Sequence, residues 1–407
     1  MAPGPGSCDR SRFWFCYAPW RFLGYLRQIP ENAARFLALA CILALAQLFR
    51  AQDQPLVQEN AAVPLVPAYF VYGDSTVDVG NNNFLRTLAR ADIPPYGKDF
   101  DTHEPTGRFS NGRLSIDYLA KFIGLPFPAP FLSGLNITTM RHGANFASAG
   151  AGILSESGGD LGQHIPLVEQ IQQVSDFKDQ LVFNHGREAA RKLMSRSLHY
   201  ISIGSNDFIH YYLRNVSGVE SDISPLDFNN LLVATLVSQL KILYDVGVRK
   251  MVVVGIGPLG CTPYFLYEDG SKTGSCISEI NFMVEEYNNA LRVEVEKMYE
   301  SHTDLDVIYC DIYDGLFPIV QNPSSFGFQT ATVACCGMGR FGGWLMCLLP
   351  EMACHNASTH VWWDEFHPTD RANEFLAKSI WSGDSFQLCH EMTLQQLIAQ
   401  PDRSSAP

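Results

Sequence analysis

The chain has 407 residues, of which 46% are hydrophobic and 17% charged, a composition typical of globular proteins with a sizeable core. Its formal net charge is −13 and it contains no run of basic residues, which argues against a nucleic acid or an anionic membrane surface as partner, because both require a basic patch. The length suits one large α/β domain or two smaller ones.

Residues 1–50 are typical of a secretory signal region. Arginines precede the apolar run 36–46, whose Ala44 and Ala46 have the spacing that signal peptidase prefers. The run is too short to cross the roughly 30 Å hydrocarbon core comfortably. We therefore expect cleavage near residues 46–51, export from the cell and no stable membrane insertion, with a signal anchor as the alternative.

After this region, short apolar runs alternate with longer helical patterns. Each run ends at a glycine or a polar turn, as buried parallel strands do at their carboxyl ends, and the runs are 65–72, 199–203, 251–254 and 306–309. The helical patterns cover 226–245, which stops at Gly247, 279–300, with Phe282 and Leu291 on its apolar face, and a last segment from Thr369 to Ile380. This alternation predicts a parallel sheet covered on both faces.

We expect one domain from 65 to 390, since no repeat or low-complexity linker divides the chain, followed by a polar tail over 391–407. In such a sheet, ligands bind in the crevice at the carboxyl ends of the strands. Ser75, which follows the first strand, and the segment after Gly204, which follows the second, would both lie there.

The cysteines indicate disulfide bonds. Of the 11 cysteines, Cys8, Cys16 and Cys41 precede residue 50, and the others are Cys261, Cys276, Cys310, Cys335, Cys336, Cys347, Cys354 and Cys389. An even number in an exported chain favours bridges. The short loop 261–276 and the crowded segment 335–354 are the expected stapled regions, with connectivity left open. A zinc site that includes His355 and His360 is the alternative for the crowded segment, but no paired C-x-x-C spacing supports it, and we expect no metal.

Three N-glycosylation sequons begin at Asn136, Asn215 and Asn356. Sequons of this type are accepted on surface loops of secreted proteins. They agree with export and predict an extracellular glycoprotein.

Ser75, Asp364 and His367 stand in the order of a nucleophilic hydrolase triad. A serine hydroxyl attacks an ester only when a neighbouring base removes its proton, and that base works best when a third group fixes its tautomer. Asp364, three residues before His367, could accept from Nδ1–H and leave Nε2 to face Ser75. Each piece alone also has an ordinary structural explanation, because Gly-Asp-Ser is a common turn composition. His367 precedes Pro368, so it should lie on a loop before the last helix.

Six sequence blocks carry a family resemblance. They are 70–75 (FVYGDS), 78–83 (DVGNNN), 105–113 (PTGRFSNGR), 143–150 (GANFASAG), 203–208 (IGSNDF) and 363–368 (WDEFHP). In this order they resemble the plant GDSL esterase/lipases of the SGNH hydrolase superfamily, over nearly the whole chain after residue 65.

The resemblance implies a three-layer α/β/α sandwich with a central parallel sheet, which is a flavodoxin-like arrangement. It implies that Ser75 is the nucleophile, His367 the general base and acid, and Asp364 its orienting partner. The oxyanion hole would consist of the Ser75 N–H, the Gly150 N–H and the Asn206 side chain. Many members have two glycines where this chain has Ala149-Gly150, which leaves the backbone donor uncertain by one residue.

The predicted function is a secreted serine carboxylic-ester hydrolase, an esterase or lipase, that needs no cofactor. Its substrate would be a lipid, a cutin-type polyester, an acetylated polysaccharide or a small plant ester, met in the cell wall or apoplast if the source is a plant. One alternative is an acyltransferase that uses the same acyl-enzyme on Ser75. The other is a secreted binding or defence protein without turnover.

Other signals point to structure more than to chemistry. Residues 255–260 match the dinucleotide fingerprint, but Pro258 removes a donor, and Cys261-Thr262-Pro263 follow where the fingerprint needs a helix. The aromatic residues are expected mostly in the core: Trp362, Trp363, Tyr211, Tyr212, Phe326, Phe328 and Phe341. Asp207 should support the turn after the second strand, and segment 341–346 is the apolar stretch expected near the substrate.

Overall fold

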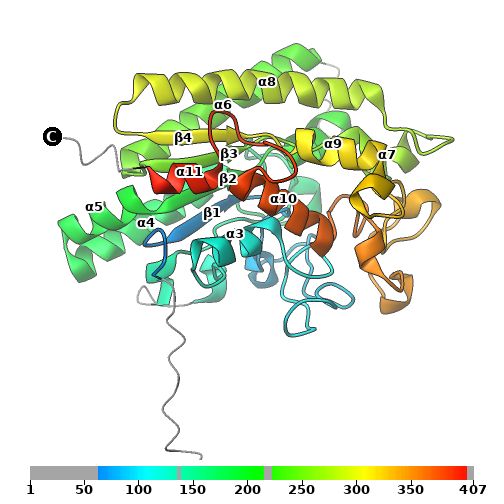
Figure 1. The fold of residues 1–407 in the computed structure, drawn as a ribbon, viewed down its shortest axis with the longest axis horizontal. Helices are drawn as coiled ribbons and strands as arrows, with labels where there is room; N and C mark the ends of the chain where they lie inside the picture. Colours follow the sequence, from blue (N-terminus) through cyan, green and yellow to red (C-terminus); the bar gives the residue numbers. More distant parts are fainter. Residues whose placement is uncertain (1–62, 135–138, 215–221, 401–407) are drawn as a thin grey trace, which may run out of the picture. The chain divides into compact units, whose positions relative to one another are not determined.

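A sheet of four parallel strands lies at the centre of the computed structural model, which describes residues 63–134, 139–214 and 222–400. The strands are β1 (Tyr69–Gly73), β2 (Leu198–Ser202), β3 (Lys250–Val254) and β4 (Asp306–Cys310), and they lie in the order β1-β2-β3-β4 (Figure 1). Each of the four expected apolar runs contributes one strand. β1 begins at Tyr69, four residues later than expected, because only from there does it pair with β2.

Helices cover both faces of the sheet. They are α3 (Ser115–Ile123), α4 (Leu167–His185), α5 (Arg187–Arg196), α6 (Pro225–Val246), α7 (Pro263–Glu268), α8 (Ser278–Ser301), α9 (Tyr313–Gln321), α10 (Asp370–Ser382) and α11 (Leu394–Ala399). Phe70 and Tyr72 pack in one core with α4, α6 and α8. Tyr69 and Val71 point to the other face, where α3, α10 and α11 cover the sheet (Figure 1). The three-layer α/β/α sandwich is confirmed.

The expected long helices form close to their predicted bounds. Ser224 caps α6 through its side chain, and Gly247 ends the helix in the left-handed region at φ 112°. α10 begins after Thr369, whose hydroxyl accepts from the N–H of Ala372. Phe282 was predicted to lie on the apolar face of α8. This prediction was wrong, because Phe282 is 61% exposed, whereas the adjacent Met283 is buried.

The folded chain continues past residue 390, so the boundary predicted there lies too early. Leu394 and Leu397 of α11 are fully buried. The buried ammonium of Lys250 on β3 donates to the Leu397 carbonyl oxygen over 3.1 Å. A helix of six residues with polar neighbours has too weak an apolar pattern to be distinguished from a tail.

Both edges of the sheet are partly covered by extended chain. Along β1, the Val71 N–H donates to the Ala144 carbonyl and the Phe146 N–H to the Val71 carbonyl, over 3.1 and 2.8 Å. Along β4, the His390 N–H donates to the Tyr309 carbonyl over 2.9 Å. Segments 144–148 and 388–390 therefore occupy part of the hydrogen-bonding edges of the outer strands.

Four disulfides join the eight cysteines that follow residue 50: Cys261–Cys276, Cys310–Cys389, Cys335–Cys354 and Cys336–Cys347. The two regions expected to be stapled are stapled. Cys335, Cys354 and His360 lie within 4.8 Å of one another through their ligand atoms. Both sulfurs belong to one disulfide, however, and a zinc ligand must be a thiolate, so the zinc alternative does not fit this arrangement.

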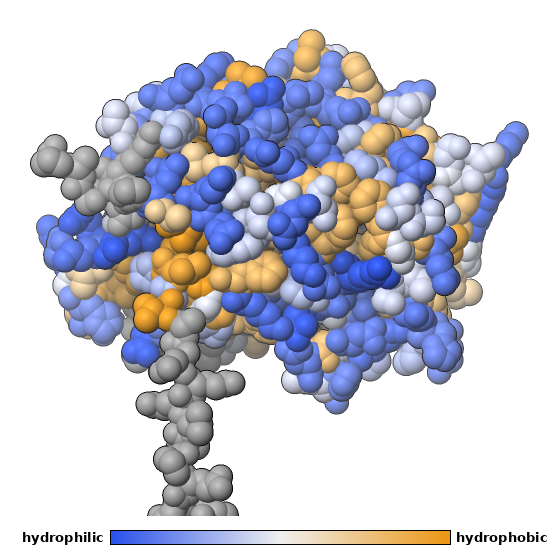
Figure 2. Space-filling model, viewed as in Figure 1, coloured by the Kyte–Doolittle hydropathy of each residue, from blue (hydrophilic) through white to orange (hydrophobic). Residues whose placement is uncertain are grey.

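Hydrophilic residues surround several hydrophobic patches on the face seen in Figure 2, as is ordinary for a globular surface. No helix among residues 63–134, 139–214 and 222–400 is long and apolar enough to span a membrane. The predicted signal region lies outside the described residues.

Candidate active site

The turn after β1 presents Ser75 at the carboxyl edge of the sheet. Gly73 has φ 157°, and a Cβ there would lie 2.1 Å from the Ser202 carbonyl oxygen, so only glycine permits this approach to β2. The buried Asp74 carboxylate accepts from the N–H and the hydroxyl of Thr76 over 2.9 and 2.7 Å. The backbone of the turn is thereby fixed, with the Ser75 side chain half-buried.

The loop before α10 brings Asp364 and His367 to Ser75. His367 Nε2 lies 2.8 Å from Ser75 Oγ, and His367 Nδ1 lies 2.8 and 2.9 Å from the two carboxylate oxygens of Asp364. Asp364 Oδ1 also accepts from the N–H groups of Phe366 and His367 over 3.0 and 2.8 Å. The structure thus brings together the three residues that the sequence predicted would meet.

The electrostatics of this loop favour one proton arrangement. Burial alone would raise the pKa of Asp364, but the neighbouring His367 and the N–H donors hold it below its ordinary value. An ionised carboxylate can only accept, so Nδ1 of His367 carries the proton and Nε2 is left to accept from the Ser75 hydroxyl. A base in this state can take a proton from the serine.

Two aromatic residues that sequence reasoning missed complete the surroundings of Asp364 and His367. The buried Tyr96 hydroxyl donates to Asp364 Oδ2 over 2.8 Å. The Phe109 ring lies 4.9 Å from the imidazole, centroid to centroid. Phe109 belongs to a block used for the resemblance, but no sequence signal connects Tyr96 to a carboxylate 268 positions away.

The three residues predicted to form the oxyanion hole, Ser75, Gly150 and Asn206, all line one cavity. The Ala149 N–H donates to Asp78 Oδ2, and the Ala151 N–H to the Ser148 carbonyl, both over 3.1 Å. The N–H of Gly150, which lies between them at φ 85°, makes no hydrogen bond within the described chain, and neither does the N–H of Ser75. Of the two candidate positions, Gly150 is therefore the one with an available donor.

Asn206 follows β2 and immediately precedes a π-helical segment, Asp207–Leu213, an irregularity often found at functional sites. Its amide donates to the Ala151 carbonyl over 2.9 Å. An amide nitrogen carries two hydrogens, so one remains for a further acceptor. Asp207, expected to support its own turn, instead accepts from the N–H groups of Ile153 and Leu154 over 2.8 and 2.9 Å.

Asp78 fixes the loop that carries Gly150. Besides Ala149, its buried carboxylate accepts from the N–H groups of Gly80 and Asn81, both over 2.7 Å. Burial raises the pKa of Asp78 to about 6, although these donors oppose the shift. In the sequence, block 78–83 contributed only to the family resemblance. The sequence did not predict that Asp78 supports the 149–150 loop.

A cavity of about 330 Å³ opens above Ser75. Its apolar lining comes from separate segments and includes Leu88, Leu161, Ile209, Leu259, Trp344, Leu345, Met346 and Phe366, and its polar lining includes His210, Arg214 and Glu365. Segment 341–346 thus contributes three of its residues, as expected near a substrate. Phe341, in contrast, does not line this cavity.

Glu365 is the unexpected ionisable group of the cavity. Its Oε2 is buried and has no hydrogen-bond partner in the described part of the chain. Burial, followed by the charge of Asp364, raises the pKa of Glu365 to about 8. Burial therefore favours the protonated carboxyl group, which, unlike a carboxylate, can donate a hydrogen bond.

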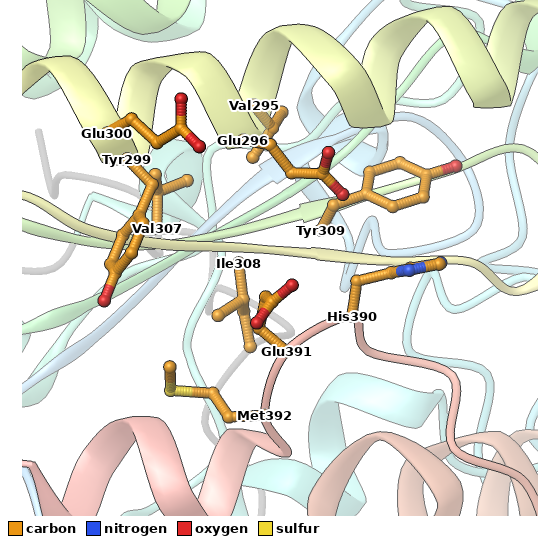
Figure 3. A pocket seen from close by; sticks show the side chains of 10 residues that line it. All are labelled: Val295, Glu296, Tyr299, Glu300, Val307, Ile308, Tyr309, His390, Glu391 and Met392. Carbon is orange, nitrogen blue, oxygen red and sulfur yellow. The ribbon is translucent and has the colours of Figure 1, made fainter.

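A second cavity, of about 230 Å³, lies between α8, β4 and the loop before α11. Figure 3 shows its charged and aromatic side chains, which include Glu296 and Glu300 from α8, Tyr309 from β4, and His390 and Glu391 from the loop. None of the predicted catalytic or oxyanion residues lines it. The candidate active site is therefore the cavity above Ser75.

The fingerprint segment and the aromatic residues considered in the sequence have structural roles. In the fingerprint segment 255–260, the N–H groups of Ile256 and Gly260 donate to side-chain oxygens of Asn288 and Asn281 over 2.9 and 2.8 Å, so the loop uses its donors inside the protein. Most of the aromatic residues considered for a groove are in the core: Trp362, Trp363, Tyr212 and Phe328 are buried, and Tyr211, Phe326 and Phe341 partly so.

Of the three sequons, only one begins within the described residues. Asn356 is exposed, and its side-chain oxygen accepts from the Ser358 N–H over 3.1 Å. Asn136 and Asn215 lie outside the described residues.

Comparison with known proteins shows the family to which the chain belongs. A family model described as GDSL-like Lipase/Acylhydrolase matches residues 69–380. The chain is 41% identical over 325 residues to GDSL esterase/lipase 7 of Arabidopsis thaliana, which covers 78% of this chain and 88% of the relative. It is 37% identical over 338 residues to GDSL esterase/lipase At1g29660 of the same plant, covering 83% and 92%. It is 38% identical over 344 residues to GDSL esterase/lipase At1g71250, covering 84% and 91%.

The fold and these likenesses define a carboxylic ester hydrolase. More particularly, the chain belongs to the GDSL-like lipase/acylhydrolase family.

Proposed function

We propose that this protein hydrolyses carboxylic esters through an acyl-enzyme on Ser75, with His367 as general base and acid and Asp364 as its orienting partner. The observation that carries the proposal is the continuous chain of contacts from Ser75 Oγ to His367 Nε2 and from Nδ1 to Asp364, each at 2.8 Å. Such a chain activates a serine that would otherwise be too weak a nucleophile.

In the first half-reaction, Ser75 Oγ attacks the ester carbonyl carbon while His367 Nε2 takes the hydroxyl proton. The tetrahedral oxyanion would accept from the N–H groups of Ser75 and Gly150 and from the Asn206 amide, and one such donor typically accounts for roughly a 100- to 1000-fold effect on rate. His367 then returns the proton to the leaving alcohol. Water, activated by the same imidazole, releases the acid and restores Ser75.

The test is a Ser75→Ala variant compared with Ser324→Ala, which changes an exposed serine on the surface. Release of p-nitrophenol from acetyl, butyryl and palmitoyl esters should fall by at least about 1000-fold in Ser75→Ala and stay unchanged in Ser324→Ala. A fluorophosphonate probe should label the wild type and the control only. Full activity in Ser75→Ala would remove Ser75 as the nucleophile.

The same assay separates the alternatives. If an added alcohol diverts most product from free acid to a new ester, the acyl-enzyme serves acyl transfer. If the folded wild-type protein neither labels nor turns over any of the esters, a binding function without catalysis replaces the proposal.

We further propose that the protein works outside the cell, in the cell wall or apoplast if its source is a plant. Four disulfides support this location, because reducing compartments do not maintain structural bridges, and exposed Asn356 is available for glycosylation. Expression in a plant host should place the mature chain, begun near residues 46–51, in the culture medium. Recovery only as an uncleaved intracellular protein would contradict the proposal.

A further inference from the structure

Among the described residues, Arg214 is the only arginine or lysine that lines the cavity above Ser75. It directly follows the π-helical segment Asp207–Leu213, and its side chain is 39% exposed. A guanidinium group is always charged and holds its N–H donors in a rigid plane. In a cavity whose lining is largely apolar, a few placed polar groups decide which substrate is accepted. Arg214 is therefore a candidate for substrate recognition.

Asp160 holds one end of the Arg214 guanidinium. Its Oδ2 accepts from Arg214 Nη1 over 3.1 Å and lies 3.0 Å from His210 Nδ1. Burial would raise the pKa of Asp160, but the contacts with His210 and Arg214 keep it below its ordinary value. Asp160 is thus an ionised partner that fixes the guanidinium through the Nη1 nitrogen.

The opposite edge of the Arg214 guanidinium, formed by Nε and Nη2, makes no hydrogen bond within residues 63–134, 139–214 and 222–400. Three other arginines use this edge to hold both oxygens of a carboxylate: Arg90 with Asp92, Arg108 with Asp117, and Arg191 with Glu188. Two parallel N–H donors match the two oxygens of a carboxylate in shape as well as in charge. Arg214 has the same edge open at the wall of a cavity.

Tyr264 provides a second polar group beside Arg214. It lines the same cavity, and its hydroxyl makes no hydrogen bond in the described part of the chain. Burial raises the pKa of Tyr264, and the positive charge of Arg214 opposes this shift, so the two side chains are close enough to interact. Of the acids that also act on Tyr264, Glu268 and Asp269 do not line the cavity. Glu365 does, but burial favours its uncharged form.

We propose that Arg214 binds a free carboxylate group of the ester substrate through its Nε and Nη2 hydrogens, with the Tyr264 hydroxyl as a further donor. The proposal rests on the proposed ester hydrolysis and names a substrate class for it, small esters that carry a carboxylate in their acyl or their alcohol part. The cavity of about 330 Å³ suits a small molecule. Because Asp160 already holds the guanidinium, less entropy is lost when the carboxylate binds.

Pairs of esters that differ in this one charge test the proposal. The first pair, p-acetoxybenzoate and p-acetoxybenzamide, has the group on the alcohol part. The second pair, the mono-p-nitrophenyl ester of suberic acid and its terminal amide, has it on the acyl part. The ratio of kcat/KM for the carboxylate to kcat/KM for the amide should be about 10 or more in one pair, because hydrogen bonds to charged groups contribute roughly a 10- to 100-fold difference. Wild-type ratios near one in both pairs would overturn the proposal.

Variants of Arg214 assign the preference to its guanidinium. Arg214→Met keeps most of the side-chain length and should lower the ratio by roughly 10- to 100-fold, mainly through a higher KM for the carboxylate ester. Arg214→Lys keeps the charge without the two-pronged edge and should retain only part of the ratio. An undiminished ratio in Arg214→Met would rule out the proposed site.

Arg90→Met is the matched control. The Arg90 side chain is also 39% exposed and has its own aspartate partner, but it does not line the cavity. Its ratio should equal that of the wild type. An equal fall in Arg90→Met and Arg214→Met would show that the preference follows the overall charge of the protein, and the site would be abandoned. Both esters of a pair are measured on the same variant, so a partial loss of folded protein leaves the ratio unchanged.

Binding without turnover separates this proposal from the proposed triad. In a Ser75→Ala background, isothermal titration calorimetry with the preferred carboxylate ester and its amide should show the same preference, and the added Arg214→Met change should remove it. If the wild type hydrolyses none of the esters while Ser75→Ala binds the carboxylate ester selectively, the triad proposal fails and the carboxylate site stands. If hydrolysis is normal while neither kinetics nor binding discriminates, only the carboxylate site fails.

Discussion

Tyr96 is a positioning residue for the proposed triad, since its hydroxyl holds the Asp364 oxygen that would otherwise depend on His367 alone. Replacing it with phenylalanine keeps the ring but leaves a buried carboxylate oxygen with one donor fewer, a loss that costs about 1–3 kcal/mol for such a group. We expect kcat of Tyr96→Phe to fall by roughly 5- to 50-fold with KM nearly unchanged, because orientation of the base matters only once chemistry begins.

Steady-state kinetics on a soluble ester measure this effect. Tyr118→Phe is the matched control, because Tyr118 donates to Asp370, outside the cavity. Equal losses in the two variants would indicate a general loss of stability and remove the positioning role.

Glu365 makes stability depend on pH. Its pKa rises from 4.5 to about 8 on folding, so between these values the folded protein holds a proton that the unfolded chain has released. The contribution of Glu365 to the free energy of unfolding therefore falls as pH rises from about 4.5 to 8 and levels off above that. Glu365→Gln removes the ionisation and should be more stable than the wild type at pH 9 by about 1–3 kcal/mol, with little difference at pH 4.5.

Urea unfolding at the two pH values tests this prediction. A stability difference that is the same at both would show that Glu365 titrates at an ordinary pKa.

At the residue scale, the sequence predicted those site residues that belong to recognisable motifs. Ser75, Asp364 and His367 were predicted because their residue types and order are specific to one chemistry. Tyr96 and Glu365 were missed for a physical reason. The role of Tyr96 depends on a contact across 268 positions, and the pKa of Glu365 depends on burial, neither of which a local pattern reports.

At the scale of elements, α11 is the part of the fold that sequence patterns did not reveal. The helix has six residues and only two fully buried ones, Leu394 and Leu397, which are too few to give a clear helical apolar pattern in the sequence. Phe282 on α8 is the opposite case, since its spacing suited the buried face although the neighbouring Met283 and Val284 take that place. Helices with caps and several apolar turns, such as α6, were predicted closely because local signals determine them.

We expect the Leu397→Ala variant to be destabilised by about 2–4 kcal/mol, because it leaves a cavity in a fully buried position. Truncation after residue 400 should cost much less, since it spares the helix. Thermal unfolding of both variants, followed by circular dichroism, gives the comparison. Equal stability of Leu397→Ala and the wild type would mean that α11 does not belong to the cooperative fold.

At the scale of the whole molecule, the sandwich could be predicted because each strand is an apolar run that ends in a turn, with a helical pattern before the next strand. Disulfide connectivity could not be, since eight cysteines allow 105 pairings and only the fold selects one. The site follows from the same architecture. The turn after β1 and the loop before α10 are nearly 300 positions apart, and parallel strands bring both to one edge of the sheet.

The covered edges of the sheet have a consequence for how copies of this protein can meet. Open edge strands offer rows of unpaired N–H and C=O groups, which is how sheets of neighbouring chains join and aggregate. Here segment 144–148 lies along β1 and segment 388–390 along the end of β4. Fewer backbone N–H and C=O groups at the sheet edges are therefore open to pair with another molecule. Where these segments cover the edges, contacts between molecules depend on side chains, including the apolar ones that are exposed at the surface.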